Sequence, residues 1–309
     1  MERAMLIRAL RAHPPLAVLT VLNTALVPVA LLGLLIDDRI IAGSPIWLKP
    51  LKFALSLALY GLSLAWALTL TTRLRRTARW AGAVAALGGT IEIVVIVVQV
   101  VRGRQSHFNQ TTELDASLYA FMGMTIAVVW VMHGLLCVVL LTSGFEDPAT
   151  ATALRFGAVI ALAGMAVGFL MTTPARGQDP ALGAVGAHSV GAPDGGGQLA
   201  LTGWSTEAGD LRVPHFIGMH ALQLLPLLVA LLPAPATPRL VRDLGGAYAG
   251  LTALALWQAL RGQPVLEPDA ATLAGLAALL AWTWFALRRA ARDRKRSSAE
   301  QDGAPAVSA

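Results

Sequence analysis

The sequence predicts an all-α membrane protein with about eight transmembrane helices. Of its 309 residues, 56% are hydrophobic and only 14% are charged, and the mean hydropathy is +0.63. A soluble domain of this size has too small a core to bury so much apolar surface, whereas lipid solvates it. The ionisable residues fall almost entirely between eight apolar stretches. Helices are the expected spans, because lipid offers no hydrogen-bond partners and a helix pairs its backbone groups internally. The alternation of apolar and polar residues that is typical of a membrane β-barrel is not present.

The predicted helices follow one another along the whole chain. In order, they cover residues 16–36, 51–71, 80–101, 117–141, 154–173, 214–232, 241–260 and 270–288. Each contains about twenty residues, enough for a helix to cross about 30 Å of hydrocarbon. Residues 1–11 are either an interfacial amphipathic turn or the basic start of a signal anchor. Residues 291–309 are charged and then rich in Ser, Ala and Gly, and we expect a disordered cytoplasmic tail.

The basic residues predict the orientation of the chain in the membrane. With the N-terminus placed in the cytoplasm, sixteen Lys and Arg fall on the inner side and eight on the outer side. Positive residues accumulate on the cytoplasmic side, so both termini are predicted to be cytoplasmic. The pI of about 10.2 is then explained by topology and by contact with anionic lipid. No nucleic-acid motif is present, and we expect no nucleic-acid partner.

A repeated pattern suggests that the bundle is a tandem duplication of four helices. Gln99-Val-Val-Arg102-Gly103 resembles Gln258-Ala-Leu-Arg261-Gly262, and each is followed by a Glu-x-Asp segment, Glu113-Leu-Asp115 and Glu267-Pro-Asp269. The predicted halves are residues 1–145 and 146–290. The alternative is that common helix caps recur by chance. The second half contains a long outer loop, 174–213, and extra chain on one face usually carries function.

Three histidines near the outer surface are the main candidates for catalysis. His107, His215 and His220 are predicted to act as acids or bases, or to contact a substrate. Imidazole also ligates haem iron and divalent metals, so a haem or metal cofactor is left open. Against ligation, His215 and His220 are about 140° apart around a helix, and no HExxH motif is present. Cys137 is the only cysteine, which excludes an intramolecular disulfide.

Cationic and amide side chains at the same surface are candidates for binding a ligand. Lys49, Lys52 and Arg102 are predicted to hold an anionic group such as a phosphate, a carboxylate or a lipid head group. Asn109, Arg212 and Gln223 complete this predicted substrate site. The alternative for the two lysines is an interfacial anchor beside Trp47.

Glu92 lies near the middle of the third predicted helix, where a carboxylate is costly and usually faces the bundle interior. It is predicted to handle a proton or a cation, or to make a structural hydrogen bond between helices. The outer loop is expected to fold over the site, with Trp204 as an apolar anchor and Asp210 and Arg212 as an ion pair. A Ser/His/Asp hydrolase is disfavoured, because the residues around His188 lack the G-x-S-x-G elbow.

Several segments resemble those of uncharacterised bacterial multi-pass membrane proteins. They are Trp47-Leu-Lys49-Pro-Leu-Lys52-Phe53, Arg102-Gly-Arg-Gln-Ser-His107-Phe-Asn109, Gly203-Trp-Ser205 and Gly209-Asp-Leu-Arg212-Val-Pro-His215-Phe-Ile-Gly-Met-His220-Ala-Leu-Gln223. The resemblance implies a location in the bacterial inner membrane and no particular activity. No role of a residue is transferred from it.

Two functions fit this sequence best. The first is a membrane-embedded enzyme or binding protein whose extracytoplasmic site takes a small or lipidic ligand, with His107, His215, His220 and Glu92 as its chemical groups. The second is a secondary transporter coupled to protons through Glu92, which internal repeats would favour. A sensor or assembly partner that binds through the outer loop is a third class.

Overall fold

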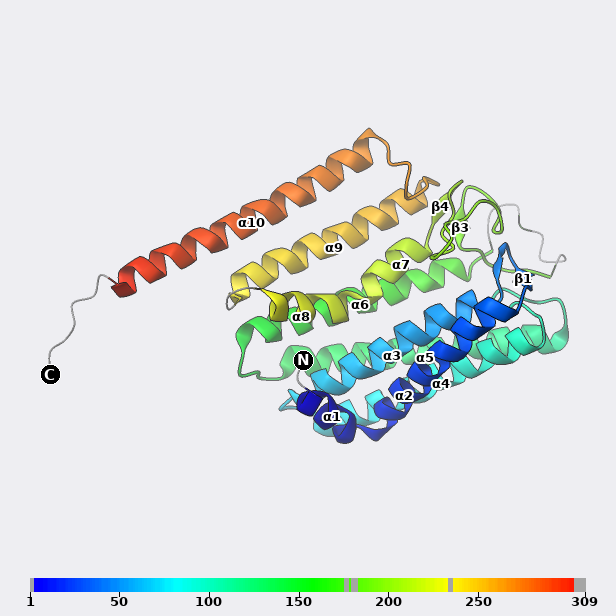
Figure 1. The fold of residues 1–309 in the computed structure, drawn as a ribbon, viewed down its shortest axis with the longest axis horizontal. Helices are drawn as coiled ribbons and strands as arrows, with labels where there is room; N and C mark the ends of the chain where they lie inside the picture. The colour runs from blue at the N-terminus through cyan, green and yellow to red at the C-terminus, as the bar shows by residue number, and fades with distance from the viewer. Residues whose placement is uncertain (1–2, 175–177, 179–182, 233–235, 303–309) are drawn as a thin grey trace.

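The computed structural model describes residues 3–174, 178, 183–232 and 236–302, and they form a bundle of long helices (Figure 1). Six helices in this part of the chain are long and apolar enough to cross a membrane: α2 (Pro14–Ile36), α3 (Leu48–Thr69), α4 (Arg75–Val101), α5 (Glu113–Thr142), α6 (Pro148–Met171) and α10 (Ala270–Asp302). The predicted class, a multi-pass helical membrane protein, agrees with this finding.

The segment predicted as the sixth span is broken. It consists of α7 (Arg212–Met219) and α8 (Ala221–Leu231), which meet at His220 with a bend of 48° and make a seventh span if counted together. The seventh predicted span is α9 (Pro238–Leu260), which is long enough but less apolar because its first turns carry Arg239, Arg242 and Asp243. The number of eight spans therefore stays a prediction.

The connections gather at two ends of the bundle. One end, which we call the loop end, contains the hairpin of β1 (Ile40–Ile41) and β2 (Ser44–Pro45) and the pair of β3 (Ser189–Val190) and β4 (Gly209–Asp210). Ile40 lies opposite Pro45 and Ser189 opposite Asp210, both in antiparallel register. The short helix α1 (Arg3–Ala12) and both chain ends lie at the opposite end (Figure 1).

Several helix starts in this bundle are capped by a side chain. The hydroxyl of Thr112 accepts the backbone N–H of Asp115 at the start of α5, and Asp147 accepts the N–H groups of Ala149 and Thr150 at the start of α6. Helices α2, α6 and α9 begin with proline, which needs no hydrogen-bond acceptor for its nitrogen there. These caps fix where the functional loops end and the helices begin.

The tightest core lies away from the loop end, where α2–α5 meet α6 and α8. Leu64, Leu136 and Leu154 are completely buried there, and Leu222 of α8 packs into the same cluster. Figure 1 shows α2–α5 as one group of helices and α6–α10 as another, with α5 packed on α6 and α3 near α8. The core joins the two groups at one end and leaves space between them toward the loop end.

The end of α10 differs from the sequence prediction. The helix continues through Asp302, although the tail was predicted to be disordered from residue 291. Its last part is rich in Ala, Arg, Lys, Glu and Gln, which are good helix formers and extend a helix beyond its apolar part. The remainder of that predicted tail, residues 303–309, lies outside the described residues.

Candidate functional site

A cavity of ≈ 700 Å³ lies between the two groups of helices at the loop end. Side chains of α3–α8 form its walls, and residues 183–211, which we call the cover, lie over its loop end. Eight of the ten predicted site residues line this single cavity: Lys49, Lys52, Glu92, His107, Arg212, His215, His220 and Gln223. The tertiary structure thus brings together three segments that are far apart in the sequence.

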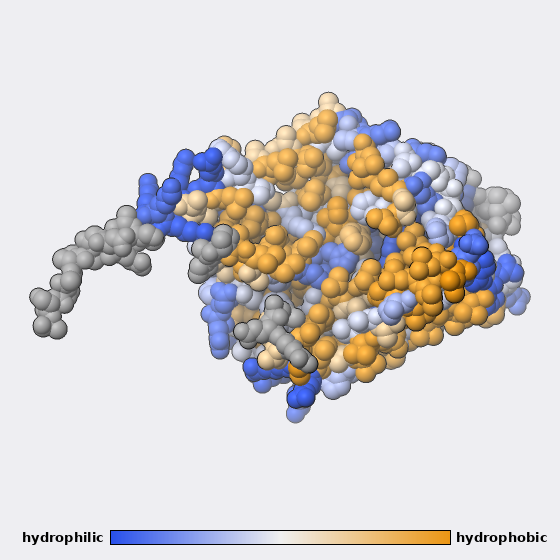
Figure 2. Space-filling model, viewed as in Figure 1, coloured by the Kyte–Doolittle hydropathy of each residue, from blue (hydrophilic) through white to orange (hydrophobic). Residues whose placement is uncertain are grey.

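The cavity has a polar and an apolar part. Below the charged groups it continues between α3, α4, α5 and α6, lined by apolar side chains such as Leu57, Ile96, Met122, Ile126 and Trp130. From Lys49 to Tyr60 along α3 the lining extends about 16 Å, at 1.5 Å per residue. Figure 2 shows hydrophilic side chains in a hollow between the two groups of helices, framed by hydrophobic surface. A polar hollow framed this way suits an amphiphilic molecule.

One face of α3 supplies much of the wall. Lys49, Phe53, Ser56 and Tyr60 line the cavity at spacings of three or four residues, so they follow one stripe of the helix. The Lys49 ammonium lies 5.8 Å from the centre of the Phe53 ring and makes no hydrogen bond or ion pair within the described part of the chain. Lys49 is therefore free to bind a ligand. The stripe could have been found in the sequence, where only the lysines were singled out.

His107 is the centre of the polar part. Its Nε2 lies 3.2 Å from Oε1 of Glu92, which is almost fully buried, and its Nδ1 lies 3.2 Å from the hydroxyl of Ser106. Burial and the nearby Lys49 ammonium lower the pKa of His107 more than Glu92 raises it. The imidazole is therefore neutral at pH 7 and is suited to accept a proton from a bound molecule.

The other two predicted histidines have different partners. His215 Nδ1 lies 2.7 Å from the carbonyl oxygen of Gly164, and His220 Nε2 lies 3.3 Å from the hydroxyl of Ser56. Within the described residues, no group of three or more His, Cys, Asp or Glu is arranged to hold a metal ion. The structure gives the metal interpretation no support. The histidines line the cavity separately, each held by its own neighbour.

Two predicted ligand-binding residues have structural contacts instead. The Arg102 guanidinium lies 2.7 Å from Oδ1 of Asp115 and also donates to Gln99, so its charge is already neutralised. Asn109 donates to the backbone of Gln105 and accepts from the N–H and hydroxyl of Thr111. Neither side chain lines the cavity. Sequence reasoning placed them at the right end of the bundle, but local hydrogen bonds occupy their polar atoms.

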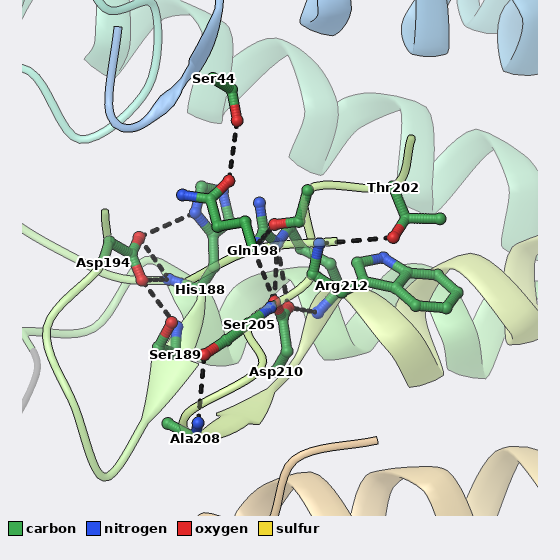
Figure 3. A network of polar contacts seen from close by, with 12 residues as sticks. Ser44, His188, Ser189, Asp194, Gln198, Thr202, Ser205, Ala208, Asp210 and Arg212 are labelled. Carbon is green, nitrogen blue, oxygen red and sulfur yellow. Dashed lines mark hydrogen bonds and ion pairs between the residues drawn. The ribbon is translucent and has the colours of Figure 1, made fainter. Parts of the chain in front are cut away.

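The cover is connected to both groups of helices. Lys52 donates to the carbonyl of Thr202 over 2.8 Å, and the hydroxyl of Ser44 donates to Gln198 over 2.7 Å. The expected Asp210–Arg212 ion pair is formed at 2.6 Å, at the foot of the cover (Figure 3). Trp204 packs edge-on against Phe216, with 6.0 Å between the ring centres. The cover is thus held across the space between α3 and α7.

The cover contains a His–Asp pair that the sequence prediction did not place in the site. His188 Nδ1 lies 2.8 Å from Oδ2 of Asp194, and both residues line the cavity (Figure 3). Burial lowers the pKa of His188 to about 4, even though Asp194 acts in the opposite direction. Burial raises the pKa of Asp194, but hydrogen bonds from His188 and Ser189 outweigh it and keep this carboxyl well below its usual range. The pair is therefore neutral imidazole beside carboxylate.

Comparisons with protein-family models, with curated proteins and with solved structures found no match for this chain. A function must therefore be argued from the cavity itself.

Proposed function

We propose that the protein binds an amphiphilic ligand with an anionic head group in this cavity, and that His107 performs acid–base chemistry on the head group. The observation that carries the proposal is the division of one cavity into a polar part around Lys49 and His107 and an apolar part between the helices. A lipid-like molecule needs both parts in this order. The hydrophilic hollow within apolar surface gives such a ligand a lateral path from the membrane (Figure 2).

The charges in the polar part favour an anion. Lys49, Lys52, Arg104 and Arg212 line it, and Arg212 is the one of these four with an ion pair in the described structure. Lys49 has no hydrogen-bond or ion-pair partner among the described residues, and a phosphate or carboxylate would supply one. Glu92 beside His107 orients the imidazole, an arrangement common where histidine transfers protons. The protein contributes positioning, a cationic field and a neutral base.

The proposed setting of this site is the extracytoplasmic side of the bacterial inner membrane. The distribution of basic residues supports eight crossings with both termini in the cytoplasm. A tandem duplication is supported by matching ion pairs, since Arg102 binds Asp115 over 2.7 Å and Arg261 binds Asp269 over 2.6 Å. Each pair joins the end of one helix to the start of the next.

Lipid binding tests the proposal directly. Native mass spectrometry of the purified full-length protein with phosphatidylglycerol or phosphatidylcholine should show preferential binding of the anionic lipid. Lys49→Gln should weaken that binding about tenfold, because a charge-assisted contact contributes roughly 1.5–3 kcal/mol. Lys295→Gln, an exposed change among the basic residues near the end of α10, is the control for loss of one positive charge outside the cavity and should weaken binding far less than Lys49→Gln.

Equal binding of the two lipids, or an unchanged affinity in Lys49→Gln, would contradict the proposal. The chemical step has its own readout in lipid extracts incubated with the reconstituted protein. A product that accumulates with the wild-type protein and not with His107→Asn supports acid–base chemistry at His107.

A proton-coupled transporter is the second candidate, and one specific observation favours it. The span formed by α7 and α8 is bent by 48° at His220, and broken helices at a buried site are typical of transporters. Glu92→Gln and His107→Ala would not distinguish the two functions, because these side chains are in contact. Whether the bundle opens below the cavity does distinguish them, because a transporter must open there and an enzyme need not. There, His133 connects Tyr60 of α3 to the Ala158 carbonyl of α6, with contacts of 3.1 and 3.0 Å.

A further inference from the structure

Two buried polar atoms in the wall of the cavity have no partner. Oε2 of Glu92 and the hydroxyl oxygen of Tyr119 are buried and make no hydrogen bond within the described part of the chain. The Glu92 side chain is only 2% exposed, and both residues line the cavity. Buried polar atoms are nearly always paired, so unpaired atoms in a cavity wall mark where a ligand places its own polar atoms.

Both atoms belong to residues near His107. Its Nε2 lies 3.2 Å from the other carboxyl oxygen of Glu92, and its ring centre lies 6.3 Å from that of Tyr119. Glu92 is on α4 and Tyr119 is on α5, and these helices pack together next to the site through Ile96 and Met122. A ligand group that reaches both unpaired atoms therefore also lies beside the imidazole.

The chemistry of the two atoms limits what this group can be. A carboxylate oxygen only accepts hydrogen bonds, whereas a phenol hydroxyl has a proton to donate. A phosphate or carboxylate would accept from Tyr119 but would repel Glu92. An ammonium group could donate to both atoms, but it would face the positive charge of Lys49 in the same cavity. An alcohol hydroxyl donates to one and accepts from the other.

The anion site is close to this position. The Lys49 ammonium lies 5.8 Å from the Phe53 ring centre, and the Phe53 ring centre lies 5.8 Å from that of His107. A single aromatic ring thus separates the cation from the base. An anion on Lys49 and a hydroxyl between Glu92 and Tyr119 must belong to the same small head group.

Resting on the function proposed above, we propose that the ligand is an anionic amphiphile with a free hydroxyl beside its anionic group. This hydroxyl donates to Glu92, accepts from Tyr119 and lies next to His107. A phosphodiester lipid with a polyol head group has this chemistry. The hydroxyl proton then lies on the side of Glu92, the carboxylate that also contacts His107.

The test compares phosphatidylglycerol with phosphatidylethanol of the same acyl chains. Both are phosphodiesters with one negative charge, and only the first carries head-group hydroxyls. In native mass spectrometry of the full-length protein with an equimolar mixture, we expect phosphatidylglycerol to be preferred about tenfold. Tyr119→Phe should lower the ratio severalfold, because only the hydrogen bond to Glu92 is then left to favour phosphatidylglycerol. Tyr248→Phe is the matched control and should keep the ratio, because Tyr248 donates to the Ile217 carbonyl and does not line the cavity.

The outcomes separate this inference from the proposed function. Equal binding of both anionic lipids, each above phosphatidylcholine, would overturn the hydroxyl site and leave the anion site intact. A preference that survives Tyr119→Phe unchanged would also overturn it, because the hydroxyl would bind elsewhere. If neither anionic lipid exceeds phosphatidylcholine, the proposed function itself fails. The wild-type comparison needs no variant, so a folding defect in Tyr119→Phe cannot obscure it.

Discussion

Two buried carboxylates near the loop end show how partners decide the role of a residue. Asp115 is completely buried, but it accepts from Arg102, Gln99 and the hydroxyl of Thr112. Its oxygens are all used, and it holds the start of α5 against the end of α4. Among the residues that the structure describes, Glu92 has a single partner, His107, and keeps one oxygen unpaired. Of the two carboxylates, only Glu92 is available for a ligand.

At this scale the protonation of His188 predicts a pH dependence of stability. Its pKa is lowered by burial to about 4 from an ordinary 6.5, so between these values the unfolded chain binds a proton that the folded protein does not. Stability is therefore complete above pH 6.5 and is lost as the pH falls toward 4, by up to about 3 kcal/mol. We expect thermal unfolding in detergent to occur at lower temperature across this range.

The contribution of His188 is isolated by His188→Asn. The asparagine amide can still donate a hydrogen bond to Asp194, but it does not titrate. The unfolding temperature of the variant should therefore fall less between pH 6.5 and 4 than that of the wild-type protein. Tryptophan fluorescence during heating measures both proteins. Parallel curves for the two proteins would show that His188 does not carry the effect.

At the scale of elements, a stripe of glycines on α6 fixes the position of α7. A Cβ added at Gly164 would lie 2.6 Å from the Gly218 backbone, and one at Gly168 would lie 3.2 Å from the His215 ring. Small residues spaced by four allow membrane helices to approach closely. The stripe therefore sets how far His215 reaches into the cavity.

Gly164→Ala should destabilise the bundle, because the new methyl group meets backbone atoms that have no freedom to move aside. Overpacking of this kind costs about 1–3 kcal/mol, and the unfolding temperature should fall accordingly. Gly246→Ala is the matched control, since a Cβ there meets nothing within 4 Å and alanine favours the helix. If both variants unfold at the same temperature as the wild type, the close contact of α6 and α7 is not limiting.

At the scale of the whole molecule, a packed core closes the cavity toward the end opposite the loop end. Leu64, Leu136 and Leu154 are fully buried below it, and Cys137 lies in the same cluster. An enzyme or binding protein needs no opening at this level. A transporter must open it in each cycle.

Cys137 is a natural probe for such an opening, since it is the only cysteine and is 4% exposed. We expect no reaction with N-ethylmaleimide in the reconstituted protein, with or without anionic lipid, because a thiol must be accessible to react. Protein denatured in SDS is the control and should be labelled completely. Labelling that appears when phosphatidylglycerol is added would contradict a sealed bundle and favour the transporter.

The composition and spacing of this sequence determined its class and the end of the bundle where the site lies. Hydrophobic stretches of spanning length have few alternatives in lipid, and polar residues concentrate where the chain leaves it. Lys49, His107 and His220 could be chosen for this reason, and Glu92 because a carboxylate within a span is costly.

The tertiary structure alone decided which of the predicted side chains are free. Arg102 looked like a ligand-binding residue until its distance to Asp115 was known, and His188 was set aside until it was found beside Asp194 in the cavity wall. Local patterns fix helices and caps, because these depend on neighbours in the sequence. The pairing of a charge depends on residues brought close by packing, and the unpaired atoms of Glu92 and Tyr119 were visible only after every other partner had been placed.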